Sequence, residues 1–142
     1  MNIAIGGDHA SPALKKAIIE KFTKEGHVFK NFGTDDNSSV DYPDYGHPVA
    51  KAVLGSTADL GIVICGSGNG INMTVNKHAG IRSALCWNAE LASLSRQHND
   101  ANILALPARF ISEKVAFDIV DSFLKADFEG GRHQNRVAKI NC

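Results

Sequence analysis

The sequence is poor in cysteine, and its few cysteines are scattered. Three are present among 142 residues, Cys65, Cys86 and Cys142, and no two of them form a CxxC pair. An odd, dispersed set argues against a disulfide framework or a cysteine-rich zinc site and predicts free thiols in a reducing compartment. We therefore expect a cytoplasmic protein.

Net charge and long apolar runs are also absent. Fifteen Lys and Arg residues balance fifteen Asp and Glu residues, so the formal net charge is zero. Without a basic excess, neither nucleic acid nor a membrane surface is expected as a partner. No segment approaches the roughly 18 apolar residues of a membrane-spanning helix, and the first residues turn polar too early for a signal peptide.

What the sequence does contain is a regular alternation of short apolar runs and amphipathic stretches. This order is typical of repeated βα units, and 142 residues with 44% hydrophobic content suit one domain. We predict an α/β fold: a single Rossmann-like three-layer domain with a five-stranded parallel sheet and helices on both faces. The strands are expected at 2–6, 27–32, 60–65, 80–86 and 102–106.

Capping signals divide the helices from the loops. Ser11 followed by Pro12 predicts a helix start, as do Asn88 and Ser112. Another helix is expected to begin near Tyr45, with Pro48 in its first turn. The expected helices span about 12–24, 45–54, 71–78, 89–98 and 113–126. The polar stretch 33–44 predicts a loop, which is long enough to be functional.

Polar residues follow three of the expected strands, where an open parallel sheet binds its ligands. Asp8 and His9 follow the first strand, Cys65 ends the third, and Arg109 follows the fifth. These residues should converge at one edge of the sheet.

A glycine loop follows Cys65 directly. It lacks the third glycine of a dinucleotide-binding motif, because Ile71 stands there, and it lacks the Lys-Ser/Thr of a phosphate-binding P-loop. It can still turn backbone N–H groups toward an anion at a helix start; the alternative is a tight turn without a ligand. Its members are Gly66, Ser67, Gly68, Asn69 and Gly70.

Two side chains are candidates for proton transfer. Cys65, at a helix start, can act as a base or nucleophile if its thiolate is favoured; the alternative is a small buried hydrophobe. His98, near a helix end, can donate a proton; the alternative is a capping or solvent-facing role. The six histidines show no ligand spacing with each other or with cysteine, so no metal is expected.

Two further pairs of residues each have two alternative roles. Arg132 and Arg136 would share one face of a helical tail and could bind a phosphate dianion, or that face could simply be solvated. Tyr42 and Tyr45 could line the site or be structural.

Six segments, taken in order, resemble type B ribose 5-phosphate isomerases over nearly the whole chain. Each segment is weak alone, but the ordered set is specific. The wider family includes allose 6-phosphate isomerases and galactose 6-phosphate isomerase subunits. The segments are GDH at 7–9, DYPDY at 41–45, ICGSGNGI at 64–71, NKHAGIRS at 76–83, SRQHNDAN at 95–102 and EGGRHQNRV at 129–137.

The resemblance implies an aldose–ketose isomerase that interconverts ribose 5-phosphate and ribulose 5-phosphate in the pentose phosphate pathway, without a cofactor. It implies that Cys65 moves the proton through an enediolate, that the glycine loop holds the oxyanion and that His98 assists opening of the furanose ring. Some relatives instead place a glutamate base at the position of Ile71, so this chain matches the cysteine type.

The remaining roles also come from the resemblance. Asp8 and Asn99 would bind sugar hydroxyls. The phosphate end would be formed by His9, Arg109, Arg132 and Arg136.

Family members are dimers or dimers of dimers, so the resemblance implies active sites shared between subunits. It also implies that the tail, about 127–142, contacts a partner. An allose or galactose 6-phosphate isomerase, or a subunit of one, is the nearest alternative. A nucleotide-binding regulatory module is the alternative from another class.

Overall fold

The computed structural model describes residues 1–141, so the free thiol expected at Cys142 lies outside the described residues. Five strands form one parallel sheet in the order β2-β1-β3-β5-β4. The strands are β1 (Asn2–Gly7), β2 (Val28–Asn31), β3 (Leu60–Cys65), β4 (Ser83–Leu85) and β5 (Ile103–Pro107).

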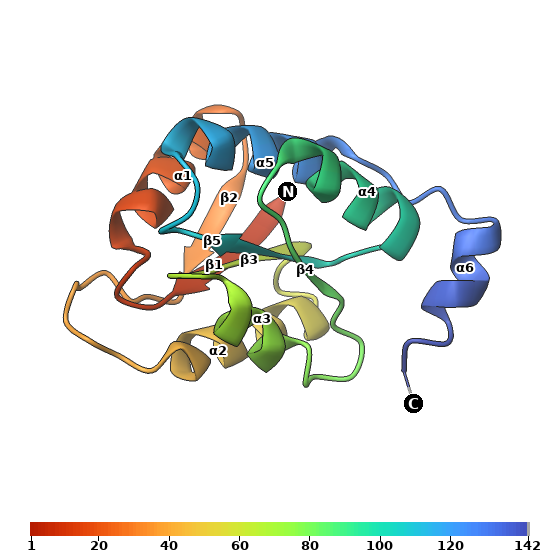
Figure 1. The fold of residues 1–142 in the computed structure, drawn as a ribbon, viewed down its shortest axis with the longest axis horizontal. Helices are drawn as coiled ribbons and strands as arrows, with labels where there is room; N and C mark the ends of the chain where they lie inside the picture. The colour runs from red at the N-terminus through yellow and green to blue at the C-terminus, as the bar shows by residue number, and fades with distance from the viewer. Residues whose placement is uncertain (142) are drawn as a thin grey trace.

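Helices cover both faces of this sheet. Figure 1 shows α1, α4 and α5 over one face and α2 and α3 over the other, while α6 lies beyond one end of the sheet. The predicted three-layer α/β fold is confirmed. None of the helices in residues 1–141 is long and apolar enough to span a membrane. The helices are α1 (Pro12–Lys24), α2 (Tyr42–Leu54), α3 (Asn69–Val75), α4 (Ala89–Asn99), α5 (Glu113–Lys125) and α6 (Arg132–Val137).

The central strand β3 places the Cys65 side chain in the layer formed by α2 and α3. All six of its residues are buried, as expected for a strand covered on both faces. Ile62 and Ile64 pack with α1 and α5, whereas Val63 and Cys65 pack with α2 and α3. Because side chains alternate along a strand, Cys65 ends β3 on the side that faces α3.

Several element boundaries differ from the sequence prediction. Helix α2 begins at Tyr42 rather than near Tyr45, because Pro43 occupies its first turn and Pro48 lies inside the helix. A first-turn proline costs no helical hydrogen bond, so either proline fits the pattern and the sequence could not choose between them. Strand β4 is shorter than predicted, and α3 begins earlier, at Asn69.

A buried lysine fixes the loop that leads into α2. Lys15 is 1% exposed. Its ammonium donates to Asn31 Oδ1 at 2.8 Å, to the Thr34 carbonyl at 2.6 Å and to Asp35 Oδ1 at 2.6 Å. Since three donors meet three acceptors, the charge is buried without an unpaired group. The hydrogen bonds that Asp35 accepts from Lys15 and from the side-chain amide of Asn31 lower the pKa of Asp35.

Two histidines join α2 to the turn after α3. His47 Nδ1 lies 2.7 Å from His78 Nε2. Burial, followed by the neighbouring His47 and Lys51, lowers the pKa of His78 below its ordinary 6.5. The folded protein therefore binds a proton at His78 less readily than the unfolded chain does.

This lowered pKa predicts acid sensitivity. The contribution of His78 to folding is present above about pH 6.5 and is lost as the pH falls through its lowered folded value. His78→Gln keeps a polar amide but cannot titrate, so its free energy of unfolding should fall less steeply between neutral and acid pH. Denaturant unfolding at a series of pH values measures this slope. Parallel curves for wild type and variant would contradict the assignment.

Candidate active site

The carboxyl edge of the sheet gathers the polar residues that follow β1, β3 and β5. The amide of Asp8 donates to the Ile64 carbonyl at 3.1 Å, and the amide of Arg109 donates to the Gly66 carbonyl at 3.0 Å. These hydrogen bonds join the three strand ends to each other. The structure thus brings Asp8, Cys65 and Arg109 to one edge, as the sequence predicted.

The glycine loop can exist only with glycine at its tightest position. Gly68 has φ +75°, and a Cβ there would lie 2.5 Å from Leu85 Cδ1. At Gly66 a Cβ would lie 3.2 Å from Nη1 of Arg109, so the guanidinium packs directly on the loop. Within residues 1–141, the amides of Ser67 and Gly68 donate no hydrogen bond. Both N–H groups can therefore donate to an oxyanion.

Tyr42 is a site residue that the sequence left undecided. A Cβ at Gly70 would lie 2.5 Å from its Cζ atom, so the phenol ring rests on the glycine loop. Tyr45 instead packs its Cε1 against Gly33, 3.1 Å from the Cβ position there. The two tyrosines therefore differ: Tyr42 lines the glycine loop, and Tyr45 supports the loop before α2.

Asp8 and His9 are held by local hydrogen bonds. Asp8 is 7% exposed, and its Oδ1 accepts from the Ala10 amide at 2.9 Å. His9 Nδ1 accepts from the Val40 amide at 3.2 Å. A neutral His9 in this contact carries its proton on Nε2, which can then donate to an anion.

His98 lies at the other end of the chain's sheet. It stands in the last turn of α4, which ends at Asn99. The amide of Asn102 donates to the Arg82 carbonyl at 2.9 Å, directly before β5 and β4 begin. His98 and Asn99 are therefore near the amino ends of the strands, whereas Cys65 is at a carboxyl end.

Helix α6, with Arg132 and Arg136, lies at this same end of the molecule, beyond α4 (Figure 1). One chain thus separates the predicted site residues into two groups. We call Asp8, His9, residues 65–70 and Arg109 the cysteine half. We call His98, Asn99, Arg132 and Arg136 the histidine half.

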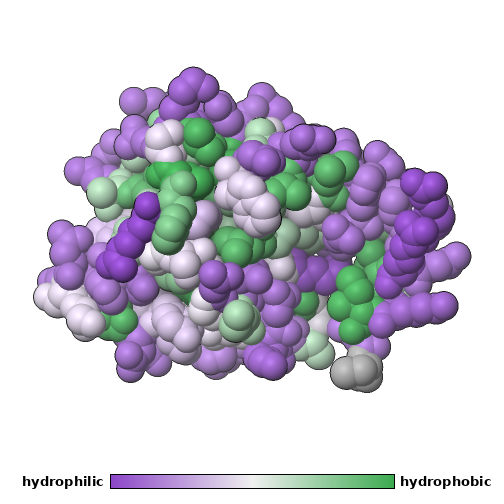
Figure 2. Space-filling view, viewed as in Figure 1, coloured by the Kyte–Doolittle hydropathy of each residue, from purple (hydrophilic) through white to green (hydrophobic). Residues whose placement is uncertain are grey.

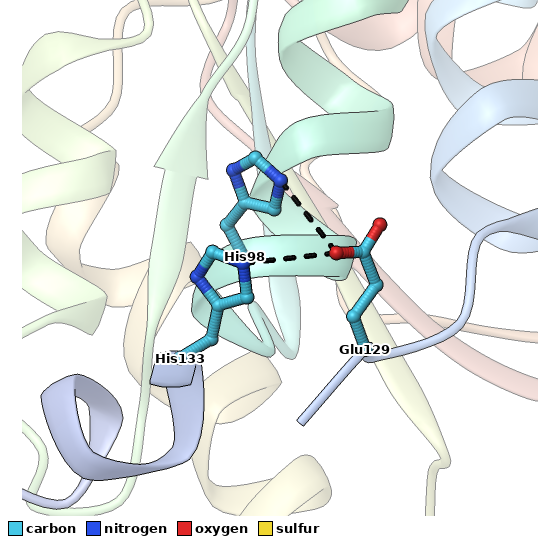
Figure 3. A group of neighbouring side chains, drawn as sticks. All are labelled: His98, Glu129 and His133. Carbon is cyan, nitrogen blue, oxygen red and sulfur yellow. Dashed lines mark ion pairs between the residues drawn. The ribbon is translucent and has the colours of Figure 1, made fainter. Parts of the chain in front are cut away.

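Two residues that lie beside the histidine half were missed by sequence reasoning. Glu129 and His133 place a carboxylate oxygen and a ring nitrogen beside His98, all three groups within 4.8 Å of one another (Figure 3). The glycine pair between Glu129 and Arg132 was the available signal, because it reverses the chain there.

Comparison with known proteins identifies the class that this fold and site define. The family model described as Ribose/Galactose Isomerase matches residues 3–140. The chain therefore belongs to the ribose/galactose isomerase family.

Individual relatives are similar along nearly their whole length. Ribose-5-phosphate isomerase B of Escherichia coli is 46% identical over 140 residues, which cover 99% of this chain and 94% of the relative. The solved ribose-5-phosphate isomerase B of Clostridium thermocellum is 53% identical, with a TM-score of 0.97 and coverage of 99% and 95%. That of Mycoplasma genitalium, solved with bound ribulose-5-phosphate, is 44% identical, with a TM-score of 0.93 and coverage of 98% and 93%.

The packing of Tyr42 on Gly70 predicts a coupled effect on stability. Gly70→Ala should lower the free energy of unfolding by about 1–3 kcal/mol, because the new methyl overpacks against the ring. In a Tyr42→Ala background the same change should be neutral or raise stability by up to about 1 kcal/mol, since alanine favours a helix. Denaturant unfolding of the four proteins forms a double-mutant cycle. An equal loss in both backgrounds would refute the contact.

Proposed function

We propose that the protein interconverts ribose 5-phosphate and ribulose 5-phosphate by proton transfer at Cys65. The observation that carries the proposal is the placement of this cysteine against a glycine loop, on a fold shared with ribose-5-phosphate isomerases B at up to 53% identity in the structures compared. Membership of a sugar isomerase family argues against the alternative function, a nucleotide-binding regulatory module.

The cysteine half supplies the chemistry of the isomerisation. The Cys65 thiolate removes the proton from C2 of the open-chain aldose, and the electron pair moves toward the C1 carbonyl oxygen. The amides of Ser67 and Gly68 stabilise the enediolate that results. Return of the proton to C1, with transfer of the proton on the C2 oxygen to the C1 oxygen, gives the ketose.

The other side chains bind the substrate. Asp8 and Asn99 are suited to sugar hydroxyls, and His98 to proton donation in ring opening. Four donors are suited to binding the phosphate group, and each arginine among them can bind two phosphate oxygens at once. These donors are His9, Arg109, Arg132 and Arg136.

The separation of the two halves supports an active site shared between two copies. A homodimer, or a dimer of dimers, lets the histidine half of one chain meet the cysteine half of another. The tail, about 127–142, would then contact the partner. Trp87 and Phe110, which flank the glycine loop, are 57% and 76% exposed. Large apolar side chains at this exposure mark a surface that another chain can cover.

Hydrophobic residues also gather on the inner side of α6. Figure 2 shows them between the α6 segment and the body of the molecule, with hydrophilic residues on the outer side. Ile140, which lies just after α6 and is 53% exposed, lines a hollow there with Ile81, Ala84 and Ala101. The tail therefore offers an apolar surface of its own to a partner.

The setting follows from the reaction and the cysteines. A sugar phosphate isomerase of this kind serves the pentose phosphate pathway, and dispersed free cysteines suit the reducing cytoplasm. Allose 6-phosphate or galactose 6-phosphate is the alternative substrate, because the family model spans ribose and galactose isomerases.

Turnover by purified, metal-chelated protein tests the proposal. Ribose 5-phosphate should be converted faster than allose 6-phosphate, and Cys65→Ala should lose about 10²- to 10⁴-fold in kcat, as expected for a lost general base. The matched control is Cys86→Ala. Burial raises the pKa of Cys86 to about 11, so its thiol is inert and its loss should leave kcat near the wild-type value.

Other outcomes assign other functions. Faster turnover of allose 6-phosphate would change the named substrate but keep the reaction. A folded wild-type protein without turnover of either sugar would overturn the proposal and favour a partner subunit that is inactive alone.

A further inference from the structure

Glu129 and His133 surround the His98 ring in the histidine half. The rings of His98 and His133 are stacked, with 4.2 Å between centroids and 9° between planes. Oε2 of Glu129 lies 3.9 Å from Nε2 of His98 and 3.6 Å from Nε2 of His133 (Figure 3). Neither residue has a role in the reaction described above.

Backbone contacts hold these two residues on α4. The amide of Glu129 donates to the carbonyl of Gln97, the neighbour of His98, at 3.0 Å. Gly130 and Gly131 then take φ values of +65° and +57°, a conformation that glycine adopts without strain. The resulting turn places residue 133 back over the same histidine, with 7% of its surface exposed.

The arrangement does not suit a metal ion. A metal bound by two imidazoles lies in the plane of each ring, and two stacked, nearly parallel planes do not meet at a common point. The three groups therefore act on each other rather than on a shared ion.

The surroundings of the cluster disfavour a proton on His133. Burial, and then the nearby His98, Arg132 and Arg136, lower the pKa of His133, while Glu129 acts in the opposite direction. A neutral His133 can stack on a charged His98, whereas two charged rings would repel.

We propose that Glu129 and His133 are positioning residues for His98, which fix the orientation of its ring by stacking and by the carboxylate contact. The inference rests on the proposed function. In ring opening the C1–O4 bond breaks, the ring oxygen takes a proton from the His98 imidazolium, and the anomeric hydroxyl releases its proton to water. His98 then regains its proton from solvent.

Glu129→Gln tests the inference, with Glu20→Gln as the matched control. Glu20 also faces a cationic partner, at 3.8 Å from Lys16, but on the exposed side of α1. With ribose 5-phosphate, Glu129→Gln should lower kcat about 3- to 10-fold, a fraction of a full general-acid effect. KM should stay the same or fall, because a negative charge near Arg132 and Arg136 is removed.

A second readout separates positioning from damage to the fold. Ribulose 5-phosphate cannot form a furanose, since its C5 oxygen carries the phosphate, so exchange of its C1 hydrogen with deuterated water needs no ring opening. This exchange should stay within about twofold of wild type in Glu129→Gln and in His98→Ala, because it needs only the base and the oxyanion site. It should be lost in Cys65→Ala.

His133 is tested by two replacements. His133→Phe keeps a stacked ring and should retain more ribose 5-phosphate turnover than His133→Ala, which loses the stack. Unchanged kcat in Glu129→Gln with an active wild type, or equal loss of turnover and exchange, would overturn the inference alone. An inactive wild type would overturn the proposed function and the inference with it.

Discussion

The separation of the cysteine half from the histidine half depends on one geometric constraint of parallel sheets. A helix that connects two parallel strands must run back along the sheet, so its last turn lies at the amino ends of the strands. Cys65 ends a strand and His98 ends a helix. No adjustment of loops within one chain joins residues at opposite ends of the same sheet. In the function proposed above, the two halves can therefore form one complete site only where two copies meet.

Much of the fold was predictable because strong local signals agreed with the tertiary structure. Leu60–Cys65 is apolar throughout and was predicted without error, and Ser11-Pro12 marked the start of α1. The predicted start of α2 was wrong, because Pro43 and Pro48 each fit the first turn of a helix. Strand β4 was predicted too long, because only Ser83–Leu85 pair with β5.

The cysteine half was predictable for the same reason. Its residues directly follow strands, and parallel strands end at one edge, so sequence position fixes spatial position. The contact of Glu129 and His133 with His98 was not predictable, because nothing local shows that residues 129 and 133 return to residue 98. That approach depends on two glycines with positive φ and on one hydrogen bond to Gln97. The packing of Tyr42 could not be predicted either, because its ring fills the space that the missing side chain of Gly70 leaves.

Close contacts at glycines link the fold to the chemistry. Arg109 and Tyr42 pack where Gly66 and Gly70 have no side chain, so the loop is held from two sides. Among the described residues, the amides of Ser67 and Gly68 have no acceptor. Lys15 contributes from a distance, because it fixes the loop that delivers Tyr42. Preorganised donors of this kind need no rearrangement as charge develops.

Mixing two inactive variants tests the shared site most directly. Cys65→Ala keeps the histidine half, and His98→Ala keeps the cysteine half, so a mixed dimer contains one complete site and one doubly defective site. Random reassociation of equal amounts should restore about a quarter of wild-type ribose 5-phosphate turnover, by the symmetry of a two-fold dimer. Mixed dimers with no turnover above the separate variants would contradict the account, because they would place both groups in one chain's site.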